Sequence, residues 1–278
     1  MSRTPSWDEA TLLGLAEVAQ RAGAAILRIY QDPAAARPLA PKADHSPLTA
    51  ADLAADAVIR EQLGRRFPGL AVLSEESQPP QGAGVAALQP GYFLVDPLDG
   101  TREFLARNGE FTVNIAWVQR GRARAGVVLA PVPGECFFGA EGAGAWRLDA
   151  QGQRRIRVAA APATGAPLRV LASRSHASAA QQALLARQPS PLHSVAAGSS
   201  LKFCRVAEGA ADLYPRLSPT MAWDTAAGQA VLEAAGGVVL CADGCTLAVP
   251  DDPCAGPNPD FMAARDAALA LQAWRLAG

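Results

Sequence analysis

The sequence predicts an α+β protein of two joined halves, in which helices pack on a largely antiparallel sheet in the first half. Apolar residues recur at helical spacing near the N-terminus, short apolar runs separated by Gly and Pro follow, and strands alternate with helices after residue 150. We expect residues 1–150 and 151–278 to form one compact unit, because a chain of 278 residues can bury most of its unfolded surface.

Two helices are expected first. One face of residues 8–31 is apolar, through Leu12, Leu13, Leu15, Val18, Ala22, Ala25, Ile26 and Ile29. The Pro- and Ala-rich stretch 32–47 predicts an irregular connection. A second helical pattern starts at Thr49 and continues to Arg66, where the sequence Phe-Pro-Gly ends it.

A sheet is expected next. Apolar runs at 70–74 and 92–95, on either side of the Pro-, Gly- and Gln-rich loop 78–90, are typical of buried strands, and each run is followed by acidic residues. Four further runs between Gly and Pro turns predict an antiparallel meander, at 111–119, 124–130, 135–139 and 145–148.

The second half is expected to begin after a polar break at 149–155. Its predicted elements are a strand at 168–172 and helices from about Ala177, at 200–208 and at 224–235. Gly236 and Gly237 are suited to end the last of these helices. The apolar tail 266–278 is interpreted as a docking helix.

Composition excludes several classes of protein. A net charge of -1 gives no electrostatic basis for binding long nucleic acid or an anionic membrane surface. The N-terminus carries acidic residues and resembles no signal peptide, and no apolar run approaches the roughly 20 residues of a membrane span. We expect a cytoplasmic protein, and leave open a peripheral association with the inner face of the cell membrane and a homodimer.

Cysteine and histidine offer little chemistry. The five cysteines are odd in number and scattered, which argues against a disulfide framework. Cys241 and Cys245 have no second ligand pair that would complete a zinc site. The three histidines are far apart in the sequence.

Acidic residues mark four places where a strand ends or a helix begins: Thr49 to Asp52, Ser74 to Glu76, Asp96 to Thr101, and Trp223 with Asp224. Oxygen ligands without histidine favour a hard cation, and Mg²⁺ fits best. Each place also has a purely structural interpretation, as a turn, a helix cap or a solvated loop. A two-metal hydrolytic centre is one explanation that covers all four.

The segment Asp-Pro-Leu-Asp-Gly-Thr at 96–101 is the richest of these. Its two carboxylates lie three residues apart across a tight turn, and the Leu98 carbonyl is a candidate neutral ligand. Gly100 allows a close approach of the backbone to phosphate, and Thr101 starts a short helical pattern whose N–H groups can hold phosphate oxygens.

These motifs, together with Ser-Pro-Leu-Thr-Ala-Ala-Asp at 46–52, Leu-Ser-Glu-Glu at 73–76 and Trp-Asp-Thr-Ala-Ala-Gly at 223–228, resemble the inositol monophosphatase superfamily of lithium-sensitive phosphatases. The runs 107–114 and 199–204 resemble its bacterial 3'(2'),5'-bisphosphate nucleotidase branch, the CysQ proteins. The resemblance implies a layered α/β/α/β/α sandwich of the inositol monophosphatase/fructose-1,6-bisphosphatase type.

The resemblance also implies site residues. Glu75, Asp96 and the Leu98 carbonyl would hold one Mg²⁺, and Asp96, Asp99 and Asp224 a second, with two or three ions in all. Asp52 and Thr101 would activate the attacking water, with Glu75 beside them. The first half would thus supply most metal ligands, and the second half Asp224 and the specificity residues.

For substrate binding, the resemblance implies contacts from the metal-site residues Glu75, Leu98, Asp99, Gly100, Thr101 and Asp224 and from Gly198, Ser199 and Ser200. Lys202 and Arg216 are added as cations for a second phosphate, with solvated surface charge as the alternative. Arg102 departs from the lysine usual in the nucleotidases.

The implied reaction is Mg²⁺-dependent hydrolysis of adenosine 3',5'-bisphosphate to AMP and phosphate, in sulfur metabolism and with lithium inhibition. Inositol 1-phosphate or a related sugar phosphate is the main alternative substrate. Leu98 to Thr101 also resembles the aspartyl-nucleophile motif of haloacid dehalogenase-like phosphatases, in which Asp96 would be phosphorylated, but one residue, not two, separates the aspartates there. A metal- and phosphometabolite-binding protein without catalysis is the alternative from another class.

Overall fold

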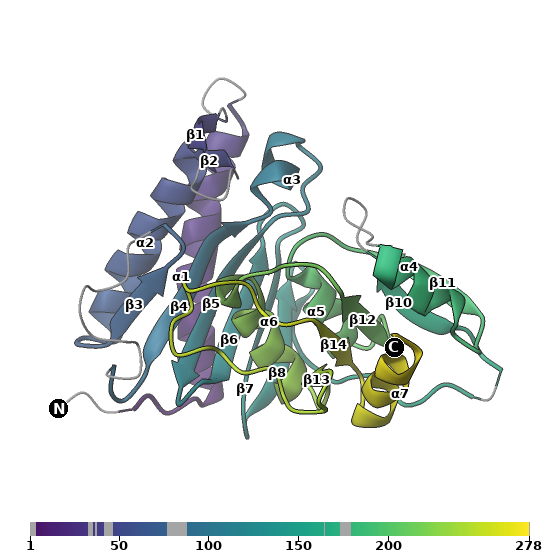
Figure 1. Ribbon diagram of the computed structural model, residues 1–278. Coiled ribbons are helices and arrows are strands. Elements are labelled where there is room, and N and C mark those ends of the chain that lie inside the picture. Colours follow the sequence, from purple (N-terminus) through teal and green to yellow (C-terminus); the bar gives the residue numbers. More distant parts are fainter. Residues whose placement is uncertain are drawn as a thin grey trace.

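The structure, a computed structural model, describes residues 4–32, 36, 38–41, 47–76, 88–163, 165–172 and 179–277. Helices and sheets alternate in five layers (Figure 1). Helices α1 (Glu9–Tyr30) and α2 (Ala50–Arg66) cover a seven-stranded sheet, and α5 (Leu201–Ala207) and α6 (Ala222–Ala234) separate it from a five-stranded sheet. Helices α4 (Ala179–Ala186) and α7 (Ala267–Ala277) cover the outer face of the smaller sheet. The predicted α+β sandwich is confirmed.

The large sheet is nearly all antiparallel. Its strands are hydrogen-bonded in sequence order: β3 (Ala71–Ser74), β4 (Tyr92–Asp99), β5 (Thr112–Gln119), β6 (Arg122–Ala130), β7 (Glu135–Ala140), β8 (Gly144–Asp149) and β9 (Gly152–Ile156). Only β3 and β4 run parallel, so their C-terminal ends meet at one edge. That edge therefore presents Glu75 and Asp96 together.

Helix α1 is apolar enough to be checked as a membrane span. It passes by length and composition, yet 56% of its apolar window is buried inside the protein. Leu12, Leu15 and Ile26 are fully buried and belong to the core that α1 and α2 form with the large sheet. Packing on the sheet thus accounts for the apolar face.

The small sheet has the order β11-β10-β12-β14-β13. Its strands are β10 (Leu168–Ala172), β11 (Leu192–Ala196), β12 (Leu213–Arg216), β13 (Val238–Cys241) and β14 (Phe261–Ala264). One face packs on α5 and α6, and the other on α4 and α7. The tail helix α7 thus closes the outermost core, as predicted for residues 266–278.

Helix α6 lies unusually close to the large sheet. A Cβ added to Gly126 on β6 would come 2.4 Å from the backbone carbonyl oxygen of Ala227 on α6. A Cβ added to Gly228 would come 2.6 Å from the ring of Phe203 on α5. The close packing of α6 against β6 and α5 is therefore possible because Gly126 and Gly228 have no side chain.

Several sequence predictions need correction. The polar break predicted at 149–155 is a hairpin, and its second strand, β9, is polar because it lies exposed at the sheet edge. Part of the irregular connection 32–47 forms the small hairpin of β1 (Pro38–Pro41) and β2 (Pro47–Thr49). The sequence pattern also missed β11 to β14, which are short. Residues 78–87 of the predicted loop lie outside the described residues.

Candidate metal and phosphate site

Three carboxylates from two elements meet at one end of the middle layer. Asp96 and Asp99 lie on the last part of β4, and Asp224 lies in the first turn of α6. One oxygen of each lies within 4.8 Å of the others. Glu75 joins them because its N–H donates to the carbonyl of Val95 (3.0 Å), which places it at the end of β3 beside Asp96. All four predicted acidic ligands are therefore together.

These residues line a cavity of about 290 Å³. Its wall consists of Pro47, Glu75, Asp96, Leu98, Asp99, Gly100, Thr101, Arg102, Glu103, Ser199, Lys202, Arg216 and Asp224. A smaller cavity of about 70 Å³ shares Asp99, Ser199, Lys202, Arg216 and Asp224, and adds Ser200 to its lining. Gly198 lines neither cavity, because it packs against Glu110.

The end of β4 is irregular, and this shapes the site. The pairing of β4 with β5 shifts register between Asp96 and Asp99, and the N–H of Leu98 turns back to donate to Asp96 Oδ1 at 3.0 Å. Gly100 follows with φ of 92°, and a Cβ there would lie 2.3 Å from Ser199 Oγ. Only glycine suits this position. The short helix α3 (Thr101–Leu105) begins directly after it.

Asp52 reaches the site from the start of α2. It accepts hydrogen bonds from the N–H and the hydroxyl of Thr49 at 2.8 and 2.6 Å, which is the predicted capping box. Its other oxygen accepts from Thr101 Oγ1 at 3.4 Å, and the same hydroxyl lies 3.4 Å from the Leu98 carbonyl. Asp52 and Thr49 are fully buried. The structural and catalytic interpretations of Asp52 are thus compatible, since one oxygen caps the helix and the other faces Thr101.

Asp99 is held from the second half of the chain. The N–H of Ser200 donates to Asp99 Oδ2 at 2.7 Å, and Thr112 Oγ1 approaches the same oxygen at 3.4 Å. The hydroxyls of Thr112 and Ser200 are 2.8 Å apart, and Ser200 Oγ lies 2.6 Å from Asn114 Oδ1. All three polar side chains of this group, Thr112, Asn114 and Ser200, are buried. They fix the Asp99 carboxylate in place.

Burial opposes the ionisation of the carboxyl groups in this cluster. It is the largest cause that raises the pKa of Asp99, although the nearby charge of Lys202 lowers it. Burial also raises the pKa of Asp224, and the negative charge of Asp99 adds to this effect. A bound cation would reverse both effects by favouring the ionised carboxylates.

Lys202 and Arg216 both face the cavity. The Lys202 side chain is buried and donates to the Ser199 carbonyl at 2.9 Å, and burial lowers its pKa to about 8. Its description as a solvated surface charge is therefore wrong. Arg216 donates to the carbonyls of Ser218 and Pro219 at 3.0 and 2.8 Å, which orients its guanidinium group.

Three supporting residues were not predicted as site residues. Thr112 and Asn114 lie on β5, where Asn114 is the direct cross-strand partner of Asp96. Asn258 donates to the Met221 carbonyl at 2.8 Å and to Thr225 at 3.1 Å, and so anchors the turn that starts α6. The register of β4 and β5 pairs Asp96 with Asn114 and Asp99 with Thr112, so a prediction of that register would have identified Thr112 and Asn114. Of the segment 46–52, Ser46 lies outside the described residues.

The family model described as "Inositol monophosphatase family" matches residues 8–275. The chain belongs to this family. The predicted recognition, fold and phosphatase class are thereby confirmed, and the haloacid dehalogenase-like alternative is excluded.

Known relatives are similar to this chain over most of its length. The 3'(2'),5'-bisphosphate nucleotidase CysQ of Escherichia coli K12 is 48% identical over 220 residues, which are 79% of this chain and 86% of the relative. CysQ of Salmonella typhimurium is 46% identical over 83% of this chain and 90% of its own length. The crystal structure of CysQ from Bacteroides thetaiotaomicron superimposes with a TM-score of 0.78 at 36% identity, covering 93% of this chain and 98% of that one.

Proposed function

We propose that this family member is a Mg²⁺-dependent phosphatase that hydrolyses adenosine 3',5'-bisphosphate to AMP and phosphate. The observation that carries the proposal is the cluster of Asp96, Asp99 and Asp224 next to the buried Asp52–Thr101 pair. The similarity to bisphosphate nucleotidases named CysQ supports the choice of substrate.

The donor set fits divalent cations. Carboxylate oxygens converge within 4.8 Å, the Leu98 carbonyl lines the same cavity, and all these ligands are oxygens, as Mg²⁺ prefers. Glu75, Asp96 and the Leu98 carbonyl would hold one ion, and Asp96, Asp99 and Asp224 a second. Bound Mg²⁺ would lower the pKa of the attacking water and neutralise charge on the phosphate oxygens. Two or three ions are proposed.

The residues of the chain have distinct roles in this proposal. Asp52 accepts the proton that Thr101 Oγ1 passes on from the water, because Asp52 Oδ1 lies 3.4 Å from that hydroxyl. The backbone at Gly100 and Thr101 approaches the phosphate closely, since Gly100 presents no side chain. Glu75 orients the attacking water beside Asp52 and Thr101.

The second phosphate and the nucleoside are assigned to the other wall. Lys202 and Arg216 are proposed as the cations that bind the second phosphate, because both line the cavity. Among the described residues, both donate to backbone carbonyls and neither forms an ion pair with a carboxylate. Ser199 faces the cavity and is proposed as a substrate contact. Gly198 and Ser200 are proposed to act by shaping this wall.

Inositol 1-phosphate is the second candidate substrate. The inositol monophosphatase from Anabaena shares 27% identity at a TM-score of 0.72, so the same fold carries that name. Lithium inhibition and a place in sulfur metabolism belong to the nucleotidase proposal. The cytoplasmic location, the peripheral membrane association and the homodimer stay predictions.

Parallel phosphate-release assays test the proposal. Adenosine 3',5'-bisphosphate, its 5'-phosphosulfate relative and inositol 1-phosphate are compared at equal concentration, with Mg²⁺ and with a chelator. We expect Mg²⁺-dependent release with the bisphosphate as the preferred substrate. Preference for inositol 1-phosphate would replace the nucleotidase assignment, and binding of the bisphosphate without turnover would favour the non-catalytic alternative.

A further inference from the structure

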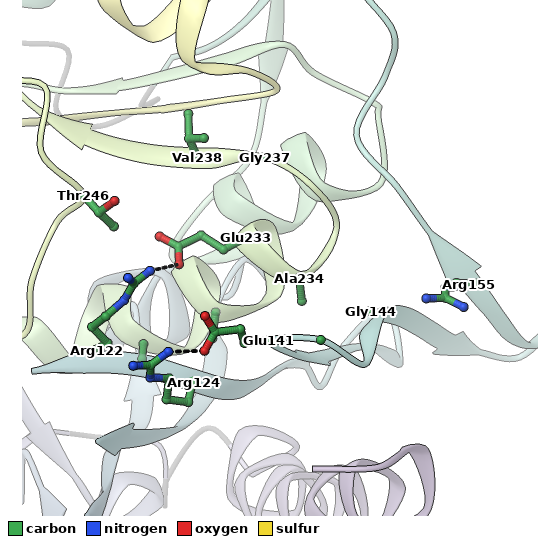
Figure 2. A pocket seen from close by; sticks show the side chains of 13 residues that line it. Arg122, Arg124, Glu141, Gly144, Arg155, Glu233, Ala234, Gly237, Val238 and Thr246 are labelled. Atoms are coloured by element: carbon green, nitrogen blue, oxygen red, sulfur yellow. Dashed lines mark hydrogen bonds and ion pairs between the residues drawn. The ribbon is translucent and has the colours of Figure 1, made fainter. Parts of the chain in front are cut away.

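A cavity of about 460 Å³ lies away from the metal site, and ion pairs offset the charge of two cations in its wall (Figure 2). Arg122 pairs with Glu233. Arg124 pairs with Glu141. A glutamate thus accompanies each of these two arginines, whereas the cations beside the metal site are held in a different way.

Lys202 is a buried cation without a paired carboxylate. It is 5% exposed, and within the described part of the chain it forms no ion pair. Its ammonium group donates to the Ser199 carbonyl at 2.9 Å. Since an ammonium group carries three donors, this hydrogen bond leaves donors for a ligand.

An aromatic ring lies where a carboxylate would otherwise hold this cation. The Lys202 nitrogen is 5.5 Å from the centroid of the Tyr214 ring, within the distance for a cation–π interaction. Tyr214 lies on β12 and lines the cavity of about 70 Å³ together with Lys202 and Arg216. A neutral ring attracts the ammonium group without cancelling its charge, so that the positive charge remains available to an anionic ligand.

Tyr214 is itself fixed by two other rings. Phe203 and Phe261 both meet it edge to face, with ring centroids 5.3 and 5.8 Å away and interplanar angles of 86°. Burial raises the pKa of Tyr214 to about 12, so the side chain is uncharged at neutral pH. Close packing of these rings therefore gives Lys202 a rigid and neutral support.

Ser199 fixes the other contact of Lys202. Its backbone is left-handed, with φ of 47°, a conformation that is uncommon for a residue with a side chain. Its hydroxyl lies 3.0 and 2.9 Å from the carbonyl oxygens of Asp99 and Glu110, which anchors this segment. The ammonium group is thus held by a fixed carbonyl and a fixed ring.

We propose that Tyr214 is a positioning residue that makes the site selective for substrates with a second phosphate. Its ring holds the Lys202 ammonium group in the cavity wall and leaves the charge of that group for the substrate. This role rests on the proposed function, in which Lys202 and Arg216 bind the phosphate that is not hydrolysed.

Steady-state assays on adenosine 3',5'-bisphosphate and adenosine 3'-monophosphate test this role, because the two substrates differ only in the second phosphate. Tyr214→Leu removes the ring, and we expect it to lower the ratio of the two kcat/KM values about tenfold, through a higher KM for the bisphosphate. Tyr214→Phe keeps the ring and should retain the ratio within about twofold.

Phe261→Leu is the matched control, because it removes a ring that contacts Tyr214 but lines neither cavity of the site. It should lower Tm and leave the ratio within about twofold of the wild-type value. Replacement of Tyr214 by pentafluorophenylalanine keeps the shape of the ring and reverses the charge on its face, so the ratio should fall even if Tyr214→Leu does not fold.

The outcomes separate this role from the proposed function. A wild-type protein that does not prefer the bisphosphate would overturn the assignment of the second phosphate, and the role of Tyr214 with it. A wild-type preference that persists in Tyr214→Leu or with pentafluorophenylalanine, or that falls equally in Phe261→Leu, would overturn the role of Tyr214 alone. A loss in Tyr214→Phe as large as that in Tyr214→Leu would also contradict the role of the ring.

Discussion

The backbone N–H of Ser200 donates to Asp99 Oδ2 at 2.7 Å, and joins residues 101 positions apart in the chain. The proposed metal ligand from the first half is thus held by the segment that starts α5 in the second half. The Ser200 hydroxyl extends the link to Thr112 and Asn114 on β5. The geometry of Asp99 therefore depends on how the two sheets meet.

Asn114→Ala should weaken Mg²⁺ binding, because it removes the side chain that orients Ser200 beside Asp99. The expected loss of affinity is about 10- to 100-fold, as for other residues that orient metal ligands. Calorimetric Mg²⁺ titration without substrate measures it directly. Ser194→Ala is the control, since Ser194 is exposed on β11. Unchanged Mg²⁺ affinity in Asn114→Ala would mean that the hydrogen-bonded group does not control Asp99.

Asp52→Asn should reduce kcat by about 100- to 10,000-fold, the range for loss of a general base. The amide oxygen can still cap α2, so folding should persist. Mg²⁺ and substrate binding, followed by calorimetry, should also persist. Asp56→Asn, one turn later on α2 and paired with Arg60 at 2.8 Å, serves as the control and should retain activity. Turnover by Asp52→Asn at the wild-type rate would refute the proton-acceptor role.

Asp224→Asn should stabilise the metal-free protein while it abolishes stabilisation by Mg²⁺. The substitution makes one of the three carboxylates within 4.8 Å neutral. The Met221 N–H donates to Asp224 Oδ2 at 2.9 Å, and the side-chain oxygen of Asn can accept the same hydrogen bond. Each kcal/mol gained should raise Tm by about 2–4 °C in a protein of this size. Thermal unfolding with Mg²⁺ and with a chelator measures both effects. A lower Tm in the chelator would contradict the mutual repulsion.

Lys202→Met should reduce kcat/KM for adenosine 3',5'-bisphosphate more than for inositol 1-phosphate. The buried ammonium group lies on the wall assigned to the second phosphate, which only the bisphosphate has. Loss of a charge-assisted contact predicts a drop of about tenfold or more in the ratio of the two kcat/KM values. Steady-state assays on both substrates provide that ratio. Equal losses on both substrates would assign Lys202 to general support of the site.

Asp212 should make stability depend on acid pH. Burial works to raise its pKa, but hydrogen bonds from the side chain and N–H of Arg169, and the charges of Arg169 and Arg265, lower it below the ordinary value of 3.8 overall. Because the folded pKa is the lower one, the stabilisation is complete above the unfolded pKa. It is lost as the pH falls through the folded pKa.

Asp212→Asn should therefore destabilise the protein at neutral pH, by about 3–5 kcal/mol for a broken buried pair, and flatten the acid side of its stability curve. Denaturant unfolding at several pH values provides both quantities. The exposed Asp260 offers a control, and Asp260→Asn should follow the wild-type curve. An unchanged acid slope in Asp212→Asn would assign the pH dependence to other groups.

The residues at the strand ends could be predicted from the sequence because their signals are local. Asp96 to Thr101 is contiguous, and Thr49 with Asp52 forms a capping box within four residues. The role of Asn114 could not be predicted, because it depends on the register that pairs Asn114 with Asp96. Apolar periodicity also failed for β11, where most side chains are exposed. Pairing between distant segments decides such features.

The close contact between Gly126 and Ala227 has a consequence for evolution and engineering. Asp224 belongs to the same rigid helix as Ala227, so any atom inserted at Gly126 would push the helix outward and carry that carboxylate away from Asp96. A single methyl group at Gly126, on a strand that carries none of the proposed ligands, would then widen the proposed metal site. The width of the proposed metal site therefore depends on the absence of a side chain at a position that supplies no ligand to it.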